Sequence, residues 1–509
     1  MKLTPPRFMM KLKSENGSLL IIALFLLTVL LLLSTAFVIN SMTEMRTSER
    51  QKMTMQSFHL AEAGMERALY DLKEDFSGVT SWSDGAINTY SLTGPDGDDF
   101  YTIDYNDTTI TNLGAGSFAV QIKYIGGTND AIWIKTTGAV GDATQNIMAY
   151  AKIKNVSPWN NAIFAGSGAS GGTTINGNVD IRGSVHILGV NLTSADYAVD
   201  LGGTTELIGN NYNGLDAGLL AKVPALPTVD FNGETIETLN AELRVKQGKV
   251  GLSGSATAGQ PDISGNAYKE TVDNVYCTDE FGGTGGSSNV HSDNGWSNGY
   301  DLGDSVEFPD LTAAYISELE TNGYVVSDAA ELTDLENIGP NSSFTIGDTN
   351  NYIEMDGTGN MTIKGIVFID ENMVAGKNGD FVMNIDGEDN IITYSGSGLI
   401  YASGNVEVNV NLVTPGSNSF PANIIGVMTS NNISMNSASI DVMGLFYAKG
   451  TITIAKQTDL IGTIVANEFD MGLNVPSVYQ VPETANFLPS GMVGQEGVRV
   501  MKIVSWQIL

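Results

Sequence analysis

Acidic side chains are the residues with which this sequence could do chemistry. Asp386, Glu388 and Asp389 lie within one short loop, DGEDN. Paired carboxylates hydrolyse glycosidic bonds, and acids that hold Ca²⁺ beside a basic residue could serve a polysaccharide lyase. Basic partners are scarce, because beyond residue 17 arginine occurs only at positions 46, 50, 67, 182, 244 and 499. The loop is therefore interpreted as a solvated turn, no catalytic residue is assigned, and the chain is predicted not to be an enzyme.

The sequence gives little support for a metal site or a reactive thiol. Asp96, Asp98 and Asp99 could face a calcium ion, but their spacing matches no EF-hand. The histidines at positions 59, 186 and 291 lie in unrelated segments without a zinc spacing. Cys277 is the only cysteine, so an intramolecular disulfide and a lipobox are excluded, and an incidental free thiol is expected. No cofactor and no metal site is predicted. The sequence also has no nucleophile elbow, phosphate-binding loop or dinucleotide fingerprint.

The composition is that of an acidic chain rich in small residues. The 509 residues include 57 Asp and Glu against 25 Lys and Arg, which gives a formal charge of −32. This balance predicts no nucleic-acid partner, because phosphate binding needs clustered basic residues. Only 16% of the residues are charged, whereas glycine occurs 58 times. Small polar residues and frequent glycine indicate a β-rich fold with many tight turns.

An uncharged segment near the N-terminus predicts the membrane topology. Ser18 to Ile39 contains 22 residues without a charge, among them Leu19, Ile22 and Leu33. As a helix it would be about 33 Å long, enough to cross a hydrocarbon core of about 30 Å. Basic residues precede it at positions 2, 7, 11 and 13, against one acid at position 15. This excess predicts a cytoplasmic N-terminus and an extracytoplasmic body.

Three interpretations of this segment compete. They are a secretory signal peptide cut after Ser34-Thr35-Ala36, a plain signal anchor, and a prepilin-type leader cut on the cytoplasmic side. The apolar run is longer than that of a signal peptide, and the helix continues beyond it. No Pro or Gly occurs between Ile39 and Gly64, and apolar residues recur at positions 58, 61, 65, 69, 72 and 76. One helix over 18–76, apolar first and amphipathic second, favours the prepilin interpretation.

Two motifs carry a resemblance to a known family. Asn16-Gly17-Ser18 opens the apolar run, and Phe58-His59-Leu60-Ala61-Glu62-Ala63-Gly64-Met65-Glu66 follows about forty residues later. Together they resemble the N-terminal segment of PilX-type minor pilins, in which a glycine precedes the span and an F-x-x-A-E-A-G element lies farther along the helix. The resemblance covers about the first 75 residues. It implies a type IV pilus or type II secretion-like system, with prepilin peptidase cutting between Gly17 and Ser18.

One position departs from the pattern of major pilins, which have a glutamate as the fifth mature residue. Ile22 occupies that position here. An uncompensated charge in apolar surroundings is costly, so the resemblance implies a tip or initiating position and not one inside the filament. The alternative is that Ile22 packs against lipid and that the protein never joins a filament.

The body is predicted in several pieces. In 77–158, runs at 101–105, 118–124, 131–135 and 146–153 indicate a small antiparallel sheet packed on the helix. In 159–204, glycines at 177, 183 and 189 repeat every six residues, as in β-helix coils. In 346–475, a glycine followed by apolar residues recurs at 365–369, 398–402, 426–430, 444–448 and 462–466. The last two intervals are both 18 residues, which suits one coil of a three-sided β-helix.

The remaining segments complete the predicted organisation. Residues 1–17 are the prepilin-type leader, and 18–76 are the transmembrane and amphipathic helix. Residues 205–345 show no regular repeat and are predicted to be a loop-rich insertion, while 476–509 form a C-terminal segment. The predicted fold is mainly β with one long N-terminal α-helix: a pilin-like helix and small antiparallel sheet, followed by a β-helix with a long loop insertion.

The predicted function is that of a minor pilin or pseudopilin that contributes to pilus assembly, by initiation or at the tip, and displays an adhesive β-helix. Two alternatives stay open: a cell-envelope structural protein outside any filament, and a surface-anchored β-helix carbohydrate-active enzyme. Expected partners are the membrane, other pilins and their assembly machinery, prepilin peptidase, and surface glycans or host and abiotic surfaces. The expected location is the cytoplasmic (inner) membrane as a single-pass protein, then the cell surface or pilus.

Overall fold

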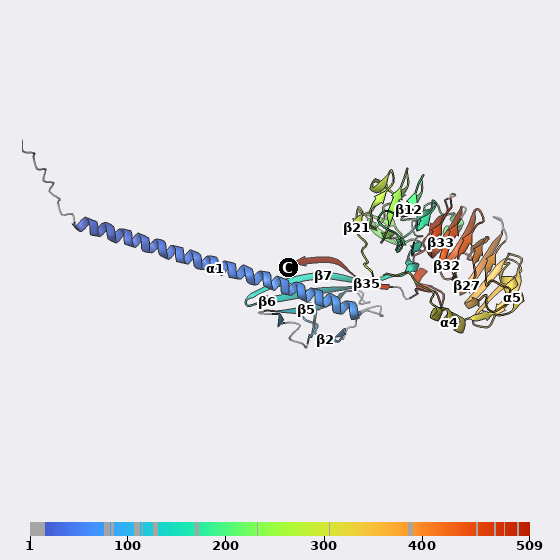
Figure 1. Cartoon of the computed structure of the whole chain (residues 1–509), viewed down its shortest axis with the longest axis horizontal. Helices are drawn as coiled ribbons and strands as arrows, with labels where there is room; N and C mark the ends of the chain where they lie inside the picture. The colour runs from blue at the N-terminus through green and yellow to red at the C-terminus, as the bar shows by residue number, and fades with distance from the viewer. Residues whose placement is uncertain are drawn as a thin grey trace, which may run out of the picture. The chain divides into compact units, whose positions relative to one another are not determined.

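The computed structural model describes residues 16–75, 82, 86–105, 112–113, 116–125, 131–167, 173–231, 233–304, 306–384, 390–454, 457–472, 475–482, 484–495 and 498–508. The chain divides into two compact units. The first unit comprises Met1–Lys154 with Arg499–Leu509, and the second unit comprises Asn155–Val498. The second unit is therefore an insertion between two segments of the first (Figure 1).

The predicted helix is present as α1, Asn16–Asp75. Its 60 residues span about 90 Å at about 1.5 Å per residue. It has no proline, and its glycines are Gly17 at the start and Gly64 in the outer half, so nothing interrupts the intervening turns. The predicted end at Phe76 lies outside the described residues.

The first unit also contains an antiparallel sheet with seven strands in spatial sequence and one short strand beside them. The strands in spatial order are β1 (Ala86–Ile87), β2 (Tyr90–Thr93), β3 (Tyr101–Ile103), β5 (Gly116–Ile125), β6 (Ala131–Val140), β7 (Ala143–Val156) and β35 (Val498–Ile508). The short strand β4 (Asn112–Leu113) pairs with β5. The four predicted strand regions all contain strands, while β35 is a strand that local pattern did not reveal.

The second unit is a stack of parallel coils with three faces, and the strands of one face run through the whole stack. Its strands in spatial order are β22 (Tyr324–Val326), β25 (Asn360–Ile369), β27 (Ile391–Ala402), β30 (Ile424–Thr429), β32 (Ile440–Ile454), β33 (Thr458–Asp470), β8 (Ile163–Ala165), β11 (Val185–Ile187), β16 (Glu242–Val245), β19 (Asn274–Cys277) and β21 (Ser297–Asn298). We call this the long face of the solenoid.

Two further faces complete each coil. The second contains β26 (Phe381–Met383), β28 (Val406–Val408), β31 (Ile433–Met435), the later parts of β32 and β33, β9 (Ile175–Asn176), β12 (Tyr197–Leu201), β17 (Lys249–Leu252) and β20 (Phe281–Gly282). The third contains β29 (Asn411–Val413), the early parts of β27, β32 and β33, β34 (Ser477–Tyr479) and β10 (Asp180–Arg182), with β13 (Glu206–Ile208) and β18 (Thr257–Ala258) beyond.

The coils do not stack in the order of the sequence. Ile163 of β8 pairs in parallel with Ile464 of β33 on one side and with Val185 of β11 on the other. The chain therefore starts in the middle of the solenoid, builds coils to one end, crosses to the other end and returns. Figure 1 shows this as green and teal strands beside red ones, with orange and yellow beyond.

A continuous apolar row runs through these coils. Val427, Phe446, Ile464, Ile163 and Val185 are neighbours in successive strands and are all fully buried. Each coil thus buries its apolar side chains against the next, while its backbone pairs with both neighbours. The first coil and the last coil in the sequence are neighbours in space, so the strand edges of each are paired with the other.

Residues 299–304 and 306–311, which we call the crossover segment, run along the outside of the long face. Arg244 of β16 binds Asp301 through two bonds of 2.8 and 3.2 Å. Farther along, the hydroxyl of Tyr447 donates to the carbonyl of Pro309 at 2.7 Å, and the ring of Phe308 stacks on Tyr447 at 5.7 Å. This segment therefore fastens coils from both halves of the solenoid.

The structure corrects the predicted loop-rich insertion at 205–345. Strands β13, β16, β17, β19, β20 and β21 lie in this range and continue the parallel coils. They are two to four residues long and pair with strands about 20 to 60 residues away in the chain, so no local periodicity reveals them. The range also contains helices α3 (Ala217–Leu220), α4 (Ala313–Asn322) and α5 (Ala329–Leu335).

The glycine repeat is also not fully in register. Gly365 pairs with Gly398, and Gly444 pairs with Gly462. Gly426, however, is opposite Leu399 and Leu445 and so lies one position out of the row. Pairing in these coils follows the apolar row and not the glycines.

Candidate functional site

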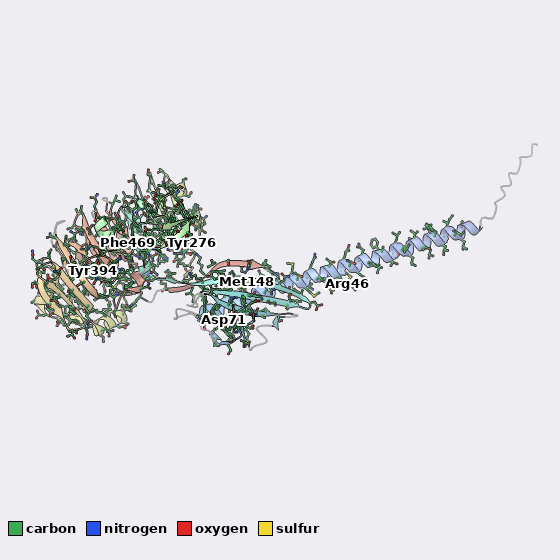
Figure 2. All side chains as sticks on the ribbon, turned by 180° about the vertical axis from the view of Figure 1, so that it is seen from behind. Arg46, Asp71, Met148, Tyr276, Tyr394 and Phe469 are labelled. Atoms are coloured by element: carbon green, nitrogen blue, oxygen red, sulfur yellow. The ribbon has the colours of Figure 1, made fainter. Side chains whose placement is uncertain are left out.

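The first part of the candidate site is the bare half of α1. The side chains of Leu19, Ile22, Leu33 and Ile39 are exposed, with relative accessibilities of 75, 59, 59 and 59%. The helix is long and apolar enough to cross a membrane. Figure 2 shows its side chains projecting freely from the start of the helix past Arg46. Such a surface is unfavourable in water, so it requires lipid or other apolar helices around it.

Polar groups inside this span are internally satisfied. The hydroxyls of Thr28, Ser34 and Thr35 donate to carbonyls four residues back at 2.6, 2.8 and 2.8 Å. Such bonds remove the need for water in an apolar environment. Gly17 and Ser18, the predicted cleavage residues, lie in the first turn of α1, but their side chains are outside the described set. Cleavage between them stays a prediction.

The F-x-x-A-E-A-G motif lies where α1 packs on the sheet. Ala61 is fully buried, and Gly64 is buried against the ring of Phe118. A Cβ on Gly64 would lie 2.8 Å from that ring, and one on Gly138 of β6 would lie 1.9 Å from the carbonyl oxygen of Ser57. Small residues on both sides therefore allow the helix backbone to lie directly on the strand.

The other motif residues have different environments. Phe58 and Ala63 are half-buried, while Glu66 is exposed. Glu62 is half-buried and its carboxylate is 2.9 Å from Nδ1 of His59. The described contacts of the motif are thus packing and local hydrogen bonds, and they hold the apolar half of α1 in a fixed relation to the sheet.

A partly buried ion pair lies near the end of α1, and sequence analysis did not anticipate it. Arg67 Nε is 2.8 Å from the Asp71 carboxylate, whose side chain is fully buried. Arg67 Nη2 also donates to the hydroxyl of Tyr90 at 2.9 Å. Burial, together with the nearby Asp71, raises the pKa of Tyr105. The four-residue spacing of Arg67 and Asp71 was the available signal.

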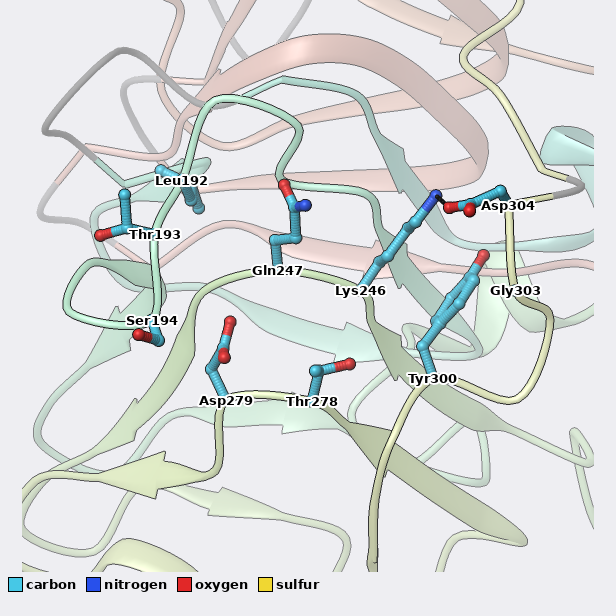
Figure 3. Close-up of a pocket in the computed structure, with 10 residues that line it drawn as sticks. All are labelled: Leu192, Thr193, Ser194, Lys246, Gln247, Thr278, Asp279, Tyr300, Gly303 and Asp304. Carbon is cyan, nitrogen blue, oxygen red and sulfur yellow. Dashed lines mark ion pairs between the residues drawn. The ribbon is translucent and has the colours of Figure 1, made fainter.

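A polar pocket of about 530 Å³ lies in the second unit where the crossover segment meets the coil corners. Its lining includes Thr193, Gln247, Asp279 and Tyr300 (Figure 3). Lys246 pairs with Asp304 at 2.8 Å and lowers the pKa of that carboxyl. Hydroxyls, an amide, carboxylates and one aromatic ring offer donors, acceptors and a stacking surface for a hydroxyl-rich ligand.

Two aspartates lie side by side on the third face. Asp441 and Asp459 are register partners in adjacent coils, eighteen residues apart in sequence. Burial, followed by the nearby charges of Asp459 and Asp216, raises the pKa of Asp441 to about 6. Burial also raises the pKa of Asp459. Asp441 lines a pocket of about 540 Å³ with Asp216 and Lys222. The 18-residue repeat was the signal that could have placed these acids together.

A second perturbed acid lies farther along the same face. Arg182 Nη1 is 2.7 Å from Glu206, and both side chains are largely buried. Burial raises the pKa of Glu206 to about 7, although Arg182 acts in the opposite direction. This pair stabilises the contact between β10 and β13.

The acids considered in the sequence have other environments. Asp386, Glu388 and Asp389 lie outside the described residues. Asp96 accepts the backbone N–H groups of Asp98 and Phe100, both at 2.9 Å, and these bonds lower its pKa. Asp96, Asp98 and Asp99 thus form a hydrogen-bonded turn, next to the ammonium of Lys123.

The predicted incidental thiol is inside the solenoid. Cys277 is fully buried and donates to the carbonyl of Glu280 at 3.3 Å. Burial raises its pKa to about 12. A thiol in this state is a weak nucleophile, because the thiolate is the reactive form.

Comparison with known proteins shows the fold. No family model and no curated protein matches the chain. The chain is similar to a solved structure, that of the competence-associated pilin ComZ from Thermus thermophilus, with a TM-score of 0.51 and 18% sequence identity. The match covers 90% of this chain and 97% of the ComZ chain. The architecture is therefore pilin-like, with a long N-terminal helix, a sheet packed on it and a large β-rich body. The similarity is one of fold.

Proposed function

We propose that this chain is a minor pilin or pseudopilin of a type IV pilus or type II secretion-like system. The observation that carries the proposal is the division of α1 into two halves. Its first half is apolar and exposed, and its second half packs on the antiparallel sheet of the first unit. One helix thus offers both a membrane anchor before assembly and an apolar surface for other pilin helices afterwards. The similarity to a pilin fold supports the same proposal.

The proposed position is the tip or the initiating complex of the filament. Ile22 stands where a major pilin has its glutamate, and its exposed side chain carries no charge to meet a neighbouring N-terminus. The inserted solenoid would then be displayed outward. We propose that it acts by adhesion to surface glycans or host and abiotic surfaces, without catalysis, and the polar pocket beside Tyr300 supports a hydroxyl-rich target.

The enzyme alternative has one observation in its favour, the adjacent pair Asp441 and Asp459. Two carboxylates of which one holds a proton near neutral pH are what acid-catalysed glycoside cleavage needs. A reducing-end assay with acidic and neutral polysaccharides tests it. Turnover that disappears in Asp441→Asn would establish the enzyme alternative in place of display.

The experiment for the main proposal is N-terminal analysis of the protein from its native host, with and without prepilin peptidase, combined with recovery in sheared filaments. The expected result is an N-terminus at Ser18 that requires the peptidase, and presence in the filament fraction. A new N-terminus near Phe37 would indicate ordinary secretion and contradict the proposal. An uncut chain that stays in the membrane would favour the envelope-protein alternative.

A further inference from the structure

The last strand of the first unit has an unusual edge. β35 follows β7 in the sheet, and no described strand pairs with its other side. It has 11 residues and contains neither proline nor glycine. Figure 1 shows it running alongside α1, with its end directed back along the helix. A long edge of this kind can offer backbone N–H and C=O groups to an added strand.

Four of the exposed side chains of β35 are apolar. Ile503, Val504, Trp506 and Ile508 have relative accessibilities of 45, 56, 48 and 55%. Successive residues of a strand point to opposite faces. The side chain of Ile503 therefore lies on one face, and those of Val504, Trp506 and Ile508 lie on the opposite face. Both faces of β35 are therefore exposed from Ile503 to Ile508, whereas Met501 packs against the core of the unit. Apolar surface next to an open edge is typical of a place where another chain adds a strand.

Other edges in the described structure are protected in familiar ways. The opposite edge of the same sheet is β1, which has two residues. One end of the solenoid finishes with β21, a two-residue strand of Ser297 and Asn298. At the other end, a hairpin of β23 (Ser343–Gly347) and β24 (Tyr352–Asp356) pairs antiparallel with β25. Short strands and terminal hairpins prevent unwanted pairing, and β35 has neither protection.

We propose that the free edge of β35 is the docking site for an extended strand of a different pilin subunit, which joins the sheet by β-augmentation. The inference rests on the proposed function. The exposed apolar side chains of β35 are Ile503, Val504, Trp506 and Ile508. The complementary strand therefore has apolar residues at alternate positions, which pack on these side chains.

A second copy of this chain does not fit the edge. A closed two-fold dimer through β35 would pair the two strands antiparallel. Because β35 and α1 belong to one unit and run alongside each other, the two α1 helices would then point in opposite directions. Helices inserted in one membrane with the same orientation cannot satisfy that arrangement. The partner strand must come from a different subunit.

The bilayer does not fit either. The turn between β6 and β7 is the part of the sheet that contacts Met53, since a Cβ on Gly141 would lie 3.3 Å from the Met53 sulfur. Met53 is fourteen positions beyond Ile39, or about 20 Å along the helix. Gln507 of β35 contacts Met148, which lies farther from that turn. The apolar strip is therefore well outside the headgroup region, which extends about 7 Å beyond the hydrocarbon core.

The test uses the full chain in its native host. A photo-crosslinking residue at Val504 is expected to give one adduct with another filament subunit, whereas the same residue at Val190, which is 60% exposed in the second unit, gives none. The double variant Val504→Lys with Trp506→Lys is expected to lower recovery in sheared filaments at least tenfold. Val190→Lys is the matched control, and equal membrane levels with the same protease-resistant solenoid fragment verify folding.

The outcomes separate this inference from the proposed function. Equal recovery of the wild-type chain and the lysine variant in filaments overturns the inference alone. An adduct with the mass of two copies of this chain, or with lipid only, also overturns it. If the wild-type chain is absent from filaments altogether, the proposed function fails and the inference fails with it.

Discussion

The indole Nε1 of Trp159 donates to the carbonyl of Val493 at 2.8 Å. Trp159 lies where the chain starts the solenoid, and Val493 lies where the chain leaves it. Both are buried, and the carbonyl of Trp159 accepts a bond from Thr463 of β33 at 3.3 Å. Trp159 thus joins the incoming segment to the outgoing segment through its indole, and to the last coil through its backbone carbonyl. These bonds close the solenoid at its middle.

Trp159→Phe is expected to destabilise the second unit. The substitution removes the donor to Val493 and leaves a buried carbonyl unpaired, with a small void beside it. The expected loss is about 2–4 kcal/mol in the free energy of unfolding, measured by denaturant unfolding of the full chain in detergent micelles. Trp506→Phe, at an exposed position, is the matched control. Equal effects of the two substitutions would contradict the role of Trp159.

Gly138→Ala is expected to disturb the contact between α1 and the sheet. The new methyl group would meet the backbone of Ser57 and Ala61, which cannot move without displacing the helix. A loss of about 2–3 kcal/mol is expected for the first unit, seen as a lower melting temperature of that unit alone. Gly97→Ala is the control, because a Cβ there has no neighbour within 4 Å. An unchanged melting curve for Gly138→Ala would show that the helix does not rest on β6.

The second unit is expected to become more stable as the pH falls from 8 to 5. The pKa values of Glu206 and Asp441 are raised to about 7 and about 6, above the usual carboxyl range in an unfolded chain. The folded state therefore takes up protons before the unfolded state does, and stability increases as pH falls through the folded pKa values. Asp459→Asn should reduce this dependence and stabilise the unit at pH 8 by about 1 kcal/mol, since the half-buried pair is partly screened by solvent. A melting temperature that is flat or falling over this range would contradict the assignment.

Arg244→Met is expected to release the crossover segment. Arg244 is buried and binds both Asp301 and Glu242, so its removal leaves two carboxylates without this partner at a cost of about 3 kcal/mol. Limited proteolysis should then cut within residues 299–311, while the wild-type chain resists. Arg244→Lys should give an intermediate result, because an ammonium cannot reproduce the two-bond contact with Asp301. Arg46→Met, on the exposed part of α1, should behave as wild type.

Ile22→Glu is expected to change the position of the chain in the filament. A carboxylate at the fifth mature residue could meet the N-terminal ammonium of a neighbouring subunit, which the apolar side chain cannot do. The number of copies per sheared filament, measured by quantitative mass spectrometry, should rise several-fold. Ile22→Leu should leave the number unchanged. No difference between the two variants would indicate that Ile22 does not determine position.

Local sequence determined the elements that depend on local physics. The uninterrupted run from Ser18 to Asp75 favoured a helix, because it contains good helix formers and no breaker before Gly64. Alternating residues in 118–124 and 131–135 required strands, and the 18-residue interval between Gly444 and Gly462 indicated stacked coils. These patterns repeat over short distances, so a single sequence reveals them.

Only the tertiary structure decided how these pieces meet. The placement of Ile163 beside Ile464, three hundred positions apart, depends on parallel backbone pairing and a shared apolar row, and neither has a signature within one segment. The same holds for β35, which joins β7 across the whole inserted solenoid. The 18-residue repeat could have placed Asp441 beside Asp459, but the burial that raises their pKa values is a property of the tertiary structure. Sequence thus predicts which residues must be buried, while the pairing of distant strands determines which side chains surround them.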